Sequence, residues 1–228
     1  ILVIAGPKAR DVLQSVSRAD WSKEAFPWLS VRECFVGYAP ATVIAVSFSG
    51  EMAYEIHVPN ASLYAAYTAL REAGKAHGMK LFGALAVEAM RMEKGYLHWK
   101  ADILTEFDPF ETGLNRFVHL DKSDFIGKAA LTERAKTPPK KKLVTLIVDS
   151  DKTPARGGAS VMDGGVVVGT VSSGGYGHRV GKNIAYAFLD APFATEGQPL
   201  VIDMLGQEIS ATVTNSALYD PDMSRVRA

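Results

Sequence analysis

Residues 47–59 read SFSGEMAYEIHVP, and this stretch decides how the first part of the chain folds. Gly50 marks a turn, and the side chains that follow alternate as in a β-strand. One side of this strand is apolar and includes Tyr54 and Ile56, so it predicts a core face. The other side carries Glu55 and His57, which face either solvent or a pocket. For a strand taken alone, solvent is the ordinary interpretation, because charged side chains are mostly exposed.

A second stretch, residues 81–97, reads LFGALAVEAMRMEKGYL and predicts a helix over 81–94. Its first half is apolar nearly all round, so we expect that half to be buried. Glu88 and Arg91 lie three residues apart and share a face, where they can touch. They form either a structural ion pair or a site in which the half-buried guanidinium of Arg91 meets a planar acid of a ligand.

Read together, the two stretches resemble the folate-binding domain of the aminomethyltransferase (glycine cleavage T-protein) family. The family pattern has a Ser/Thr-Gly-Glu turn, a strand ending in Tyr-Glu-Ile, and Leu-Arg-Leu-Glu-Lys-Gly-Tyr closing a helix. The matching residues here are 49–51, 54–56 and 90–96. The same domain forms the C-terminal region of dimethylglycine and sarcosine dehydrogenases.

Further motifs of the family follow in the same order, so the resemblance covers essentially all of the chain. They are GLNRFV at 113–118, DFIGKAAL at 124–131 and GTVSSG at 169–174. A Trp-x-x-Asp stretch at 99–102 and a Tyr-Asp-Pro ending at 219–221 favour the dehydrogenase branch over the free-standing T-protein.

The domain organisation can be predicted from how composition and secondary-structure pattern change along the chain. Residues 137–142 read TPPKKK and predict a linker, because prolines disfavour helix and strand and lysines are solvated. Six short predicted strands follow at 143–149, 160–162, 166–173, 184–189, 200–204 and 209–215. We therefore expect an α+β fold, with part of a mixed α/β folate-binding domain over 1–136 and a small antiparallel β-barrel domain over 143–228.

Residues 174–178 read GGYGH and invite comparison with a phosphate-binding loop. The context argues against that function, since a strand rather than a helix follows and the dinucleotide spacing is wrong. We expect these residues to be turn glycines.

Bulk properties narrow the function classes. The 228 residues carry 25 Lys plus Arg and 25 Asp plus Glu, which gives no electrostatic reason to expect nucleic acid or an anionic membrane as a partner. Cys34 is the only cysteine, so no intrachain disulfide forms, and its setting predicts packing within a strand. The five histidines are scattered without metal-ligand spacing, so no metal site is expected.

The first residues, ILVIA, already read as a strand, and we interpret the sequence as a fragment. In the family, an aspartate placed well upstream of a Gly-Pro-x-Ala element acts near the folate nitrogens as a general acid–base group. Here Gly6-Pro7-Lys8-Ala9 begins the chain, so that aspartate has no counterpart and the catalytic residues are unknown.

The binding residues can be argued from chemistry. One edge of a pterin ring offers an amino group and a ring N–H, and a single carboxylate can accept both. We assign this role to Glu55, and we assign Arg91 to the anionic or polar parts of folate; the family's matching residues are folate contacts. Tyr54 is a weaker candidate because its side chain should face away from Glu55. Tyr96 and Trp99, with His98 between them, either line a binding site for a flat heterocycle or pack against other side chains of the protein.

The resemblance implies one-carbon transfer to tetrahydrofolate, forming 5,10-methylenetetrahydrofolate from a methylated-amine or aminomethyl donor. FAD would belong to an N-terminal domain outside this chain, and an upstream flavin domain or other subunits are possible partners. The family implies a cytoplasmic location in bacteria or the mitochondrial matrix in eukaryotes. Two alternatives stay open: a non-catalytic scaffold or assembly domain, and a folate-dependent RNA-modification protein, for which neither a basic face nor a reactive cysteine motif is evident.

Overall fold

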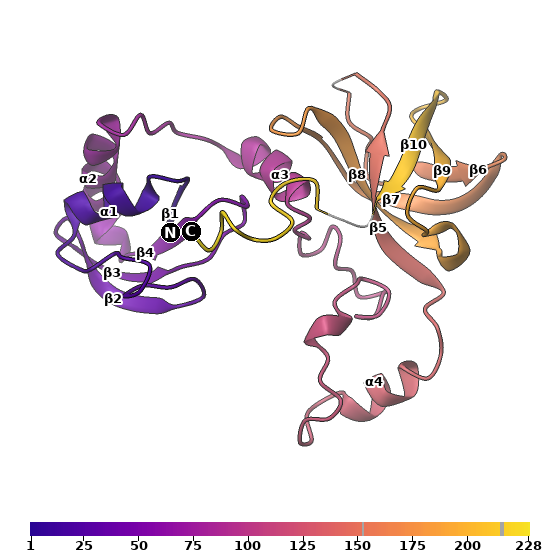
Figure 1. Ribbon diagram of the computed structural model, residues 1–228, viewed down its shortest axis with the longest axis horizontal. Helices are drawn as coiled ribbons and strands as arrows, with labels where there is room; N and C mark the ends of the chain where they lie inside the picture. Colours follow the sequence, from indigo (N-terminus) through magenta and orange to yellow (C-terminus); the bar gives the residue numbers. More distant parts are fainter. Residues whose placement is uncertain (152, 215–216) are drawn as a thin grey trace. The chain divides into compact units, whose positions relative to one another are not determined.

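The structure is a computed structural model that describes residues 1–151, 153–214 and 217–228. By compactness the chain forms two units (Figure 1): the first comprises Ile1–Lys94 and Leu218–Ala228, and the second comprises Gly95–Ala217. This division differs from the one that the sequence predicts, with its boundary at 137–142. Composition reveals a segment rich in proline and lysine, but it does not reveal that the last residues of the chain fold with the first unit.

The first unit is a four-stranded antiparallel sheet in the order β1-β4-β3-β2, with α1 and α2 packed against one face. The strands are β1 Leu2–Ala5, β2 Val31–Val36, β3 Ala39–Ile44 and β4 Ala53–His57, and the helices are α1 Ala9–Val16, α2 Leu63–Lys75 and α3 Ala84–Glu93. A 3₁₀ turn at Asn60–Ser62 leads into α2. The central strand β4 therefore has its backbone satisfied on both edges, which makes it a rigid support for side chains on either face.

Alternation along β4 produces the predicted core face. Tyr54 and Ile56 are fully buried in one cluster with Val12 and Leu13 of α1. Cys34 of β2 packs against the same cluster, and burial raises the pKa of its thiol. The opposite face of the sheet is open.

For α3, which the sequence predicts over 81–94, the expectation that its first half is buried is wrong. The helix begins at Ala84, and Leu81, Phe82 and Leu85 are all exposed. An apolar run shows only that a segment can be buried, because burial also needs a covering surface, and the described residues leave this half uncovered. The last turn of α3 is buried instead, over residues 91–94.

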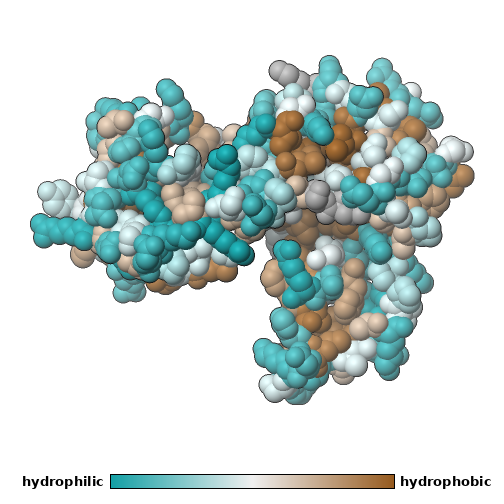
Figure 2. Space-filling model, viewed as in Figure 1, coloured by the Kyte–Doolittle hydropathy of each residue, from teal (hydrophilic) through white to brown (hydrophobic). Residues whose placement is uncertain are grey.

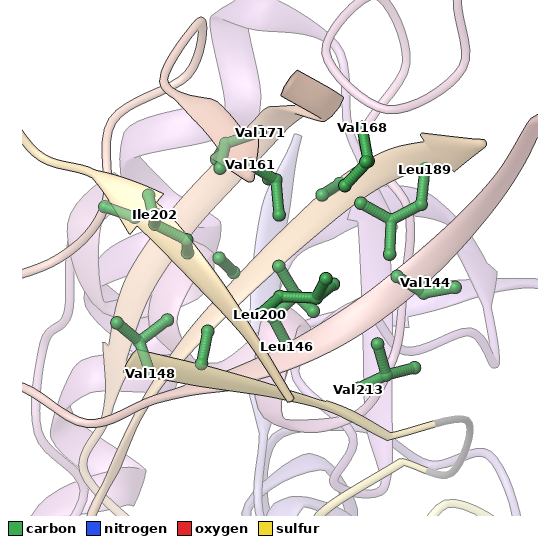
Figure 3. Packing of buried hydrophobic residues seen from close by; sticks show 14 of the residues in the cluster. Val144, Leu146, Val148, Val161, Val168, Val171, Leu189, Leu200, Ile202 and Val213 are labelled. Atoms are coloured by element: carbon green, nitrogen blue, oxygen red, sulfur yellow. The ribbon is translucent and has the colours of Figure 1, made fainter. Parts of the chain in front are cut away.

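The second unit contains the predicted barrel, which is closed, antiparallel and ordered β10-β5-β8-β7-β6-β9. Its strands are β5 Lys141–Val148, β6 Ser160–Asp163, β7 Val166–Gly177, β8 Lys182–Asp190, β9 Pro199–Asp203 and β10 Glu208–Thr214. Aliphatic side chains such as Leu146, Leu189 and Ile202 fill the interior (Figure 3). The last residue of the strand predicted over 209–215, Asn215, lies outside the described residues.

Two sequence interpretations of the barrel are corrected. Gly174 lies inside β7 rather than in a turn, and a Cβ there would come within 1.9 Å of the carbonyl oxygen of Ala155. The glycine is required because a second segment of backbone passes close to the strand. Lys141, placed in the linker by its composition, is the first residue of β5 and pairs with Asp190 of β8, since a strand end at the surface tolerates a solvated lysine.

Residues 95–140 of the second unit are mainly loops, with a 3₁₀ turn at Asn115–Phe117 and the short helix α4 at Lys128–Arg134. Arg134 closes this segment by pairing with the carboxylates of Asp108 and Glu111. Hydrophobic residues show at the surface of the segment that carries α4 (Figure 2), and the exposed apolar side chains include Phe117 and Ile126. In the part of the chain that the structure describes, no helix has the length and apolar character needed to cross a membrane.

Candidate functional site

The open face of β4 presents Glu55 and His57. The Nε2 atom of His57 lies 3.2 Å from the Oε2 atom of Glu55, and their side chains are 36% and 39% exposed. Val3 of β1 and Ile44 of β3 lie opposite Glu55 in the neighbouring strands. A carboxylate beside an imidazole, flanked by apolar residues and reachable from solvent, can accept hydrogen bonds from a ligand that lies against the sheet.

A hollow of about 620 Å³ lies beside His57. Glu33 and Phe35 of β2, Pro40 and Thr42 of β3, and Pro59 line it together with the imidazole. The hollow is within the size range of small-molecule sites, and it combines apolar walls with a few polar groups. Its position makes the open face of the sheet the candidate site of the first unit.

Arg91 lies in the last turn of α3 and is 2% exposed. Its Nε atom donates to the Oε2 atom of Glu88 at 2.7 Å, so the predicted contact between these two side chains is confirmed. The side chain of Glu88 is itself partly exposed. The ion pair accounts for the buried guanidinium on structural grounds, while a ligand contact by Arg91 stays a prediction.

Tyr54 points into the core of the first unit, on the face of β4 opposite Glu55, as its position in the alternation predicts. Its ring lies 5.6 Å from that of Trp21 and 5.5 Å from that of Phe26. Burial raises the pKa of its hydroxyl, and the nearby guanidinium of Arg10 partly counters that effect. We therefore leave Tyr54 out of the proposed site.

Tyr96 and Trp99 belong to the second unit, on the loop that follows α3. Tyr96 is half-buried and Trp99 is exposed, so the indole is accessible to a ligand. The loop is held by Asp102, which is 0% exposed. The carboxylate of Asp102 accepts from the hydroxyls of Ser172 and Ser173 at 2.6 and 2.7 Å, and from the N–H of His98 at 2.9 Å.

The sequence does not predict the buried ion pair between Lys94 and Asp220. The Nζ atom of Lys94 lies 2.9 Å from the Oδ2 atom of Asp220, and the two side chains are 1% and 2% exposed. Lys94 reaches this partner by running over Gly50, where an added Cβ would lie 3.0 Å from the lysine side chain. Both residues stand in motifs that the sequence singled out, but their pairing was invisible because 126 positions separate them.

The carboxylate of Asp220 is strongly acidic. Although burial raises its pKa, hydrogen bonds from the Arg225 N–H, from Lys94 and from the Ser224 hydroxyl hold the pKa of Asp220 well below its usual range. The carboxylate therefore stays ionised at any ordinary pH and keeps the ion pair with Lys94 intact.

No group of three or more histidine, cysteine, aspartate or glutamate side chains among the described residues is arranged to hold a metal ion. The structure brings together Glu55 with His57, and Arg91 with Glu88, as two pairs in the first unit.

The comparisons with known proteins establish the class. The chain belongs to the glycine cleavage T-protein family: residues 1–122 match the GCVT N-terminal domain, and residues 141–220 match the glycine cleavage T-protein C-terminal barrel domain. This confirms the resemblance deduced from the motifs.

Among individual proteins, the whole chain is 33% identical over 228 residues to the mitochondrial dimethylglycine dehydrogenase of Homo sapiens, of which it covers 26%. It is 34% identical over 236 residues to the mitochondrial sarcosine dehydrogenase of Mus musculus, again covering 26% of that protein. The aminomethyltransferase of Saccharopolyspora erythraea is 30% identical, with 96% of this chain and 59% of the relative covered. The chain therefore spans about a quarter of the length of the dehydrogenases that it matches.

A solved structure shares the fold. The glycine cleavage system aminomethyltransferase T from Bartonella henselae superposes with a TM-score of 0.85 at 22% sequence identity, over 96% of this chain and 59% of that one. This likeness extends across both units and supports the α+β assignment.

Proposed function

We propose that this chain binds tetrahydrofolate and serves as the one-carbon transfer portion of a larger enzyme, forming 5,10-methylenetetrahydrofolate from a methylated-amine or aminomethyl donor. The observation that carries the proposal is the accessible carboxylate of Glu55, which stands in the Tyr-Glu-Ile motif on the open face of β4. Membership of the T-protein family makes folate the expected ligand.

The residues of the site fit a pterin. A carboxylate such as that of Glu55 accepts two neighbouring N–H donors in the way it accepts an arginine fork. His57 is placed to hold this carboxylate from the side, and Val3 and Ile44 offer apolar contact to a flat ring. When bound, tetrahydrofolate supplies the nitrogens that capture the one-carbon unit; Glu55 supplies binding and orientation, and no residue of this chain is assigned a catalytic role.

Calorimetric titration with tetrahydrofolate tests this function. We expect the wild-type chain to bind and Glu55→Ala to lose about 1–3 kcal/mol of binding free energy, the scale for leaving polar partners unpaired. Glu72→Ala, which removes an exposed carboxylate from α2 of the same unit, is the matched control and should bind like wild type. Absence of binding by a folded wild-type chain, or equal affinity in Glu55→Ala, would refute the assignment.

A non-catalytic scaffold or assembly role is favoured by one observation. Arg91 is buried and already paired with Glu88, as a structural residue would be. The titration with tetrahydrofolate distinguishes the scaffold role from the one-carbon transfer role, because a scaffold with a degenerate pocket would bind no tetrahydrofolate while remaining fully folded.

We also propose that further polypeptide, such as a flavin domain carrying FAD or another subunit, covers apolar surface of the first unit. Leu81, Phe82 and Leu85 are exposed on and before α3, and a mostly apolar groove of about 760 Å³ runs between β1, α2 and this segment. In a full-length protein we expect slower amide exchange at residues 81–87 than in this chain. Equal exchange rates in the two proteins would argue against such a cover.

A further inference from the structure

The segment Leu218–Ala228 is part of the first unit and is tied to it at several points. The N–H of Tyr219 donates to the carbonyl oxygen of Glu93 at 2.9 Å, and its hydroxyl donates to Glu51. Further along, the guanidinium of Arg10 donates to the main-chain oxygen of Ala228 at 3.1 Å. The segment is therefore an integral element of the unit rather than a loose end.

The Lys94–Asp220 ion pair, with both side chains buried, is a further tie, and it joins two stretches of the first unit. On one side, Lys94 follows Arg91 by one helical turn at the end of α3. On the other, the lysine stem lies over Gly50, whose φ of +80° suits glycine and which leads through Glu51 into β4. The pair is thus positioned between the stretch that carries Arg91 and the strand that carries Glu55.

Stability alone does not explain such a pair. Two charges lose their hydration when both side chains are buried to 1–2% exposure, and well-packed apolar residues of similar volume often serve stability equally well. What a buried pair with additional hydrogen bonds provides is a single allowed geometry. Asp220 also accepts from the Ser224 hydroxyl at 2.8 Å and the Arg225 N–H at 3.0 Å, so its carboxylate is held by its own segment as well as by Lys94.

We infer that Leu218–Ala228 is a positioning element of the proposed site, with Lys94 and Asp220 as its positioning residues. The segment holds the end of α3 against the turn that precedes β4, and this contact fixes Arg91, the second folate contact that the sequence predicts, relative to Glu55. The inference rests on the proposed function for its ligand, tetrahydrofolate. The contacts of Leu218–Ala228 with the rest of the first unit are present without any ligand.

The test compares two double variants. Lys94→Met with Asp220→Asn removes the ion pair without leaving an unpaired charge, and it keeps the lysine stem over Gly50 and the amide oxygen for Ser224 and Arg225. Lys75→Met with Glu72→Gln removes an exposed ion pair from α2 by the same chemistry, since those side chains are 65% and 60% exposed. Each is titrated with tetrahydrofolate at a temperature where circular dichroism shows the native fold.

We expect the Kd for tetrahydrofolate to rise at least about tenfold in the first double variant and to stay at the wild-type value in the second. A purely structural role for the pair would lower the thermal midpoint but leave the Kd of the folded protein unchanged. Wild-type affinity in the Lys94→Met/Asp220→Asn protein therefore overturns the inference.

A second measurement needs no ligand. Amide exchange at residues 88–94 and 51–55 should quicken together, about tenfold or more, in the Lys94→Met/Asp220→Asn protein and not in the control. Unchanged protection at both places overturns the inference. If the wild-type chain binds no tetrahydrofolate, the proposed function fails by itself, and this exchange measurement still decides whether the segment positions Arg91 and Glu55.

Discussion

The two units each bury an aspartate whose carboxylate accepts from a hydroxyl and a backbone N–H, and at Asp220 the structure shows an ammonium donor in addition. In the first unit, Asp220 accepts from the ammonium of Lys94, a residue far away along the chain. In the second unit, Asp102 accepts from the hydroxyls of Ser172 and Ser173 and from a backbone N–H.

This difference between the donors indicates how much stability each unit loses when its carboxylate is removed. A hydroxyl that loses its acceptor can rotate toward another oxygen, because its hydrogen position is free. An ammonium that loses its carboxylate is left without that partner and out of water, since Lys94 has a side chain that is 1% exposed. Asp220 should therefore be the more costly of the two to remove, and the following predictions test that ranking.

The largest expected effect is that of Asp220→Ala. Removing one partner of a buried ion pair costs about 3–5 kcal/mol, because the other charge is left uncompensated. Urea denaturation followed by tryptophan fluorescence measures the loss, with Trp21 and Trp28 reporting on the first unit. A cost below about 1 kcal/mol would show that Lys94 escapes to solvent, and Leu218–Ala228 would lose its basis as a positioning element.

Asp102→Ala should cost less, about 2–3 kcal/mol. The substitution leaves two serine hydroxyls and the N–H of His98 without this acceptor, and each unsatisfied buried group costs about 1–3 kcal/mol before relaxation. The Trp99 fluorescence reports on this loop. If Asp102→Ala proves more destabilising than Asp220→Ala under the same conditions, the ranking drawn from the two kinds of donor is wrong.

Acid should weaken the first unit through Asp220. The pKa of this carboxyl is lowered in the folded protein relative to its ordinary value of 3.8, so the unfolded chain takes up the proton first. The stability that Asp220 contributes is complete above that value and declines as the pH falls below it, by about 1 kcal/mol between about pH 5 and pH 3. Asp220→Asn should lack this component, and denaturation curves of the two proteins at several pH values measure the difference.

The smallest effect is expected for Lys75→Met. Its ion pair with Glu72 is exposed, and such pairs contribute about 0–1 kcal/mol. A thermal midpoint within about 2 °C of wild type would fit this expectation. A larger loss would mean that exposure is a poor guide to the value of ion pairs in this unit.

Much of the fold could be predicted from the sequence, because its signals are local. The alternation around Tyr54 and Ile56 identified the core face of β4, and the spacing of Glu88 and Arg91 identified their contact. The short strands with glycine between them identified the barrel. Each of these inferences depends only on residues a few positions apart, where periodicity and helical spacing are informative.

What could not be predicted depends on distant parts of the chain. Whether Leu85 is buried or exposed depends on a covering surface that the local sequence does not specify, and the role of Gly174 requires knowing that Ala155 passes beside β7. The pairing of Lys94 with Asp220 had no signal in spacing. For the candidate site, Glu55 and His57 were found from the alternation along one strand, whereas the hollow beside them emerges only when β2 and β3 are placed beside β4.

The division of the first unit between residues 1–94 and 218–228 has a consequence for biosynthesis. Lys94 leaves the ribosome 126 residues before its partner Asp220. At elongation rates of about 5–20 residues per second, the lysine waits roughly 6–25 seconds for that carboxylate. The barrel waits almost as long, because its closing strand β10, Glu208–Thr214, leaves the ribosome only shortly before Asp220. We therefore expect neither unit of the nascent chain to become fully protease-resistant until residues 208–228 have emerged, although the first unit begins to be translated well before the second.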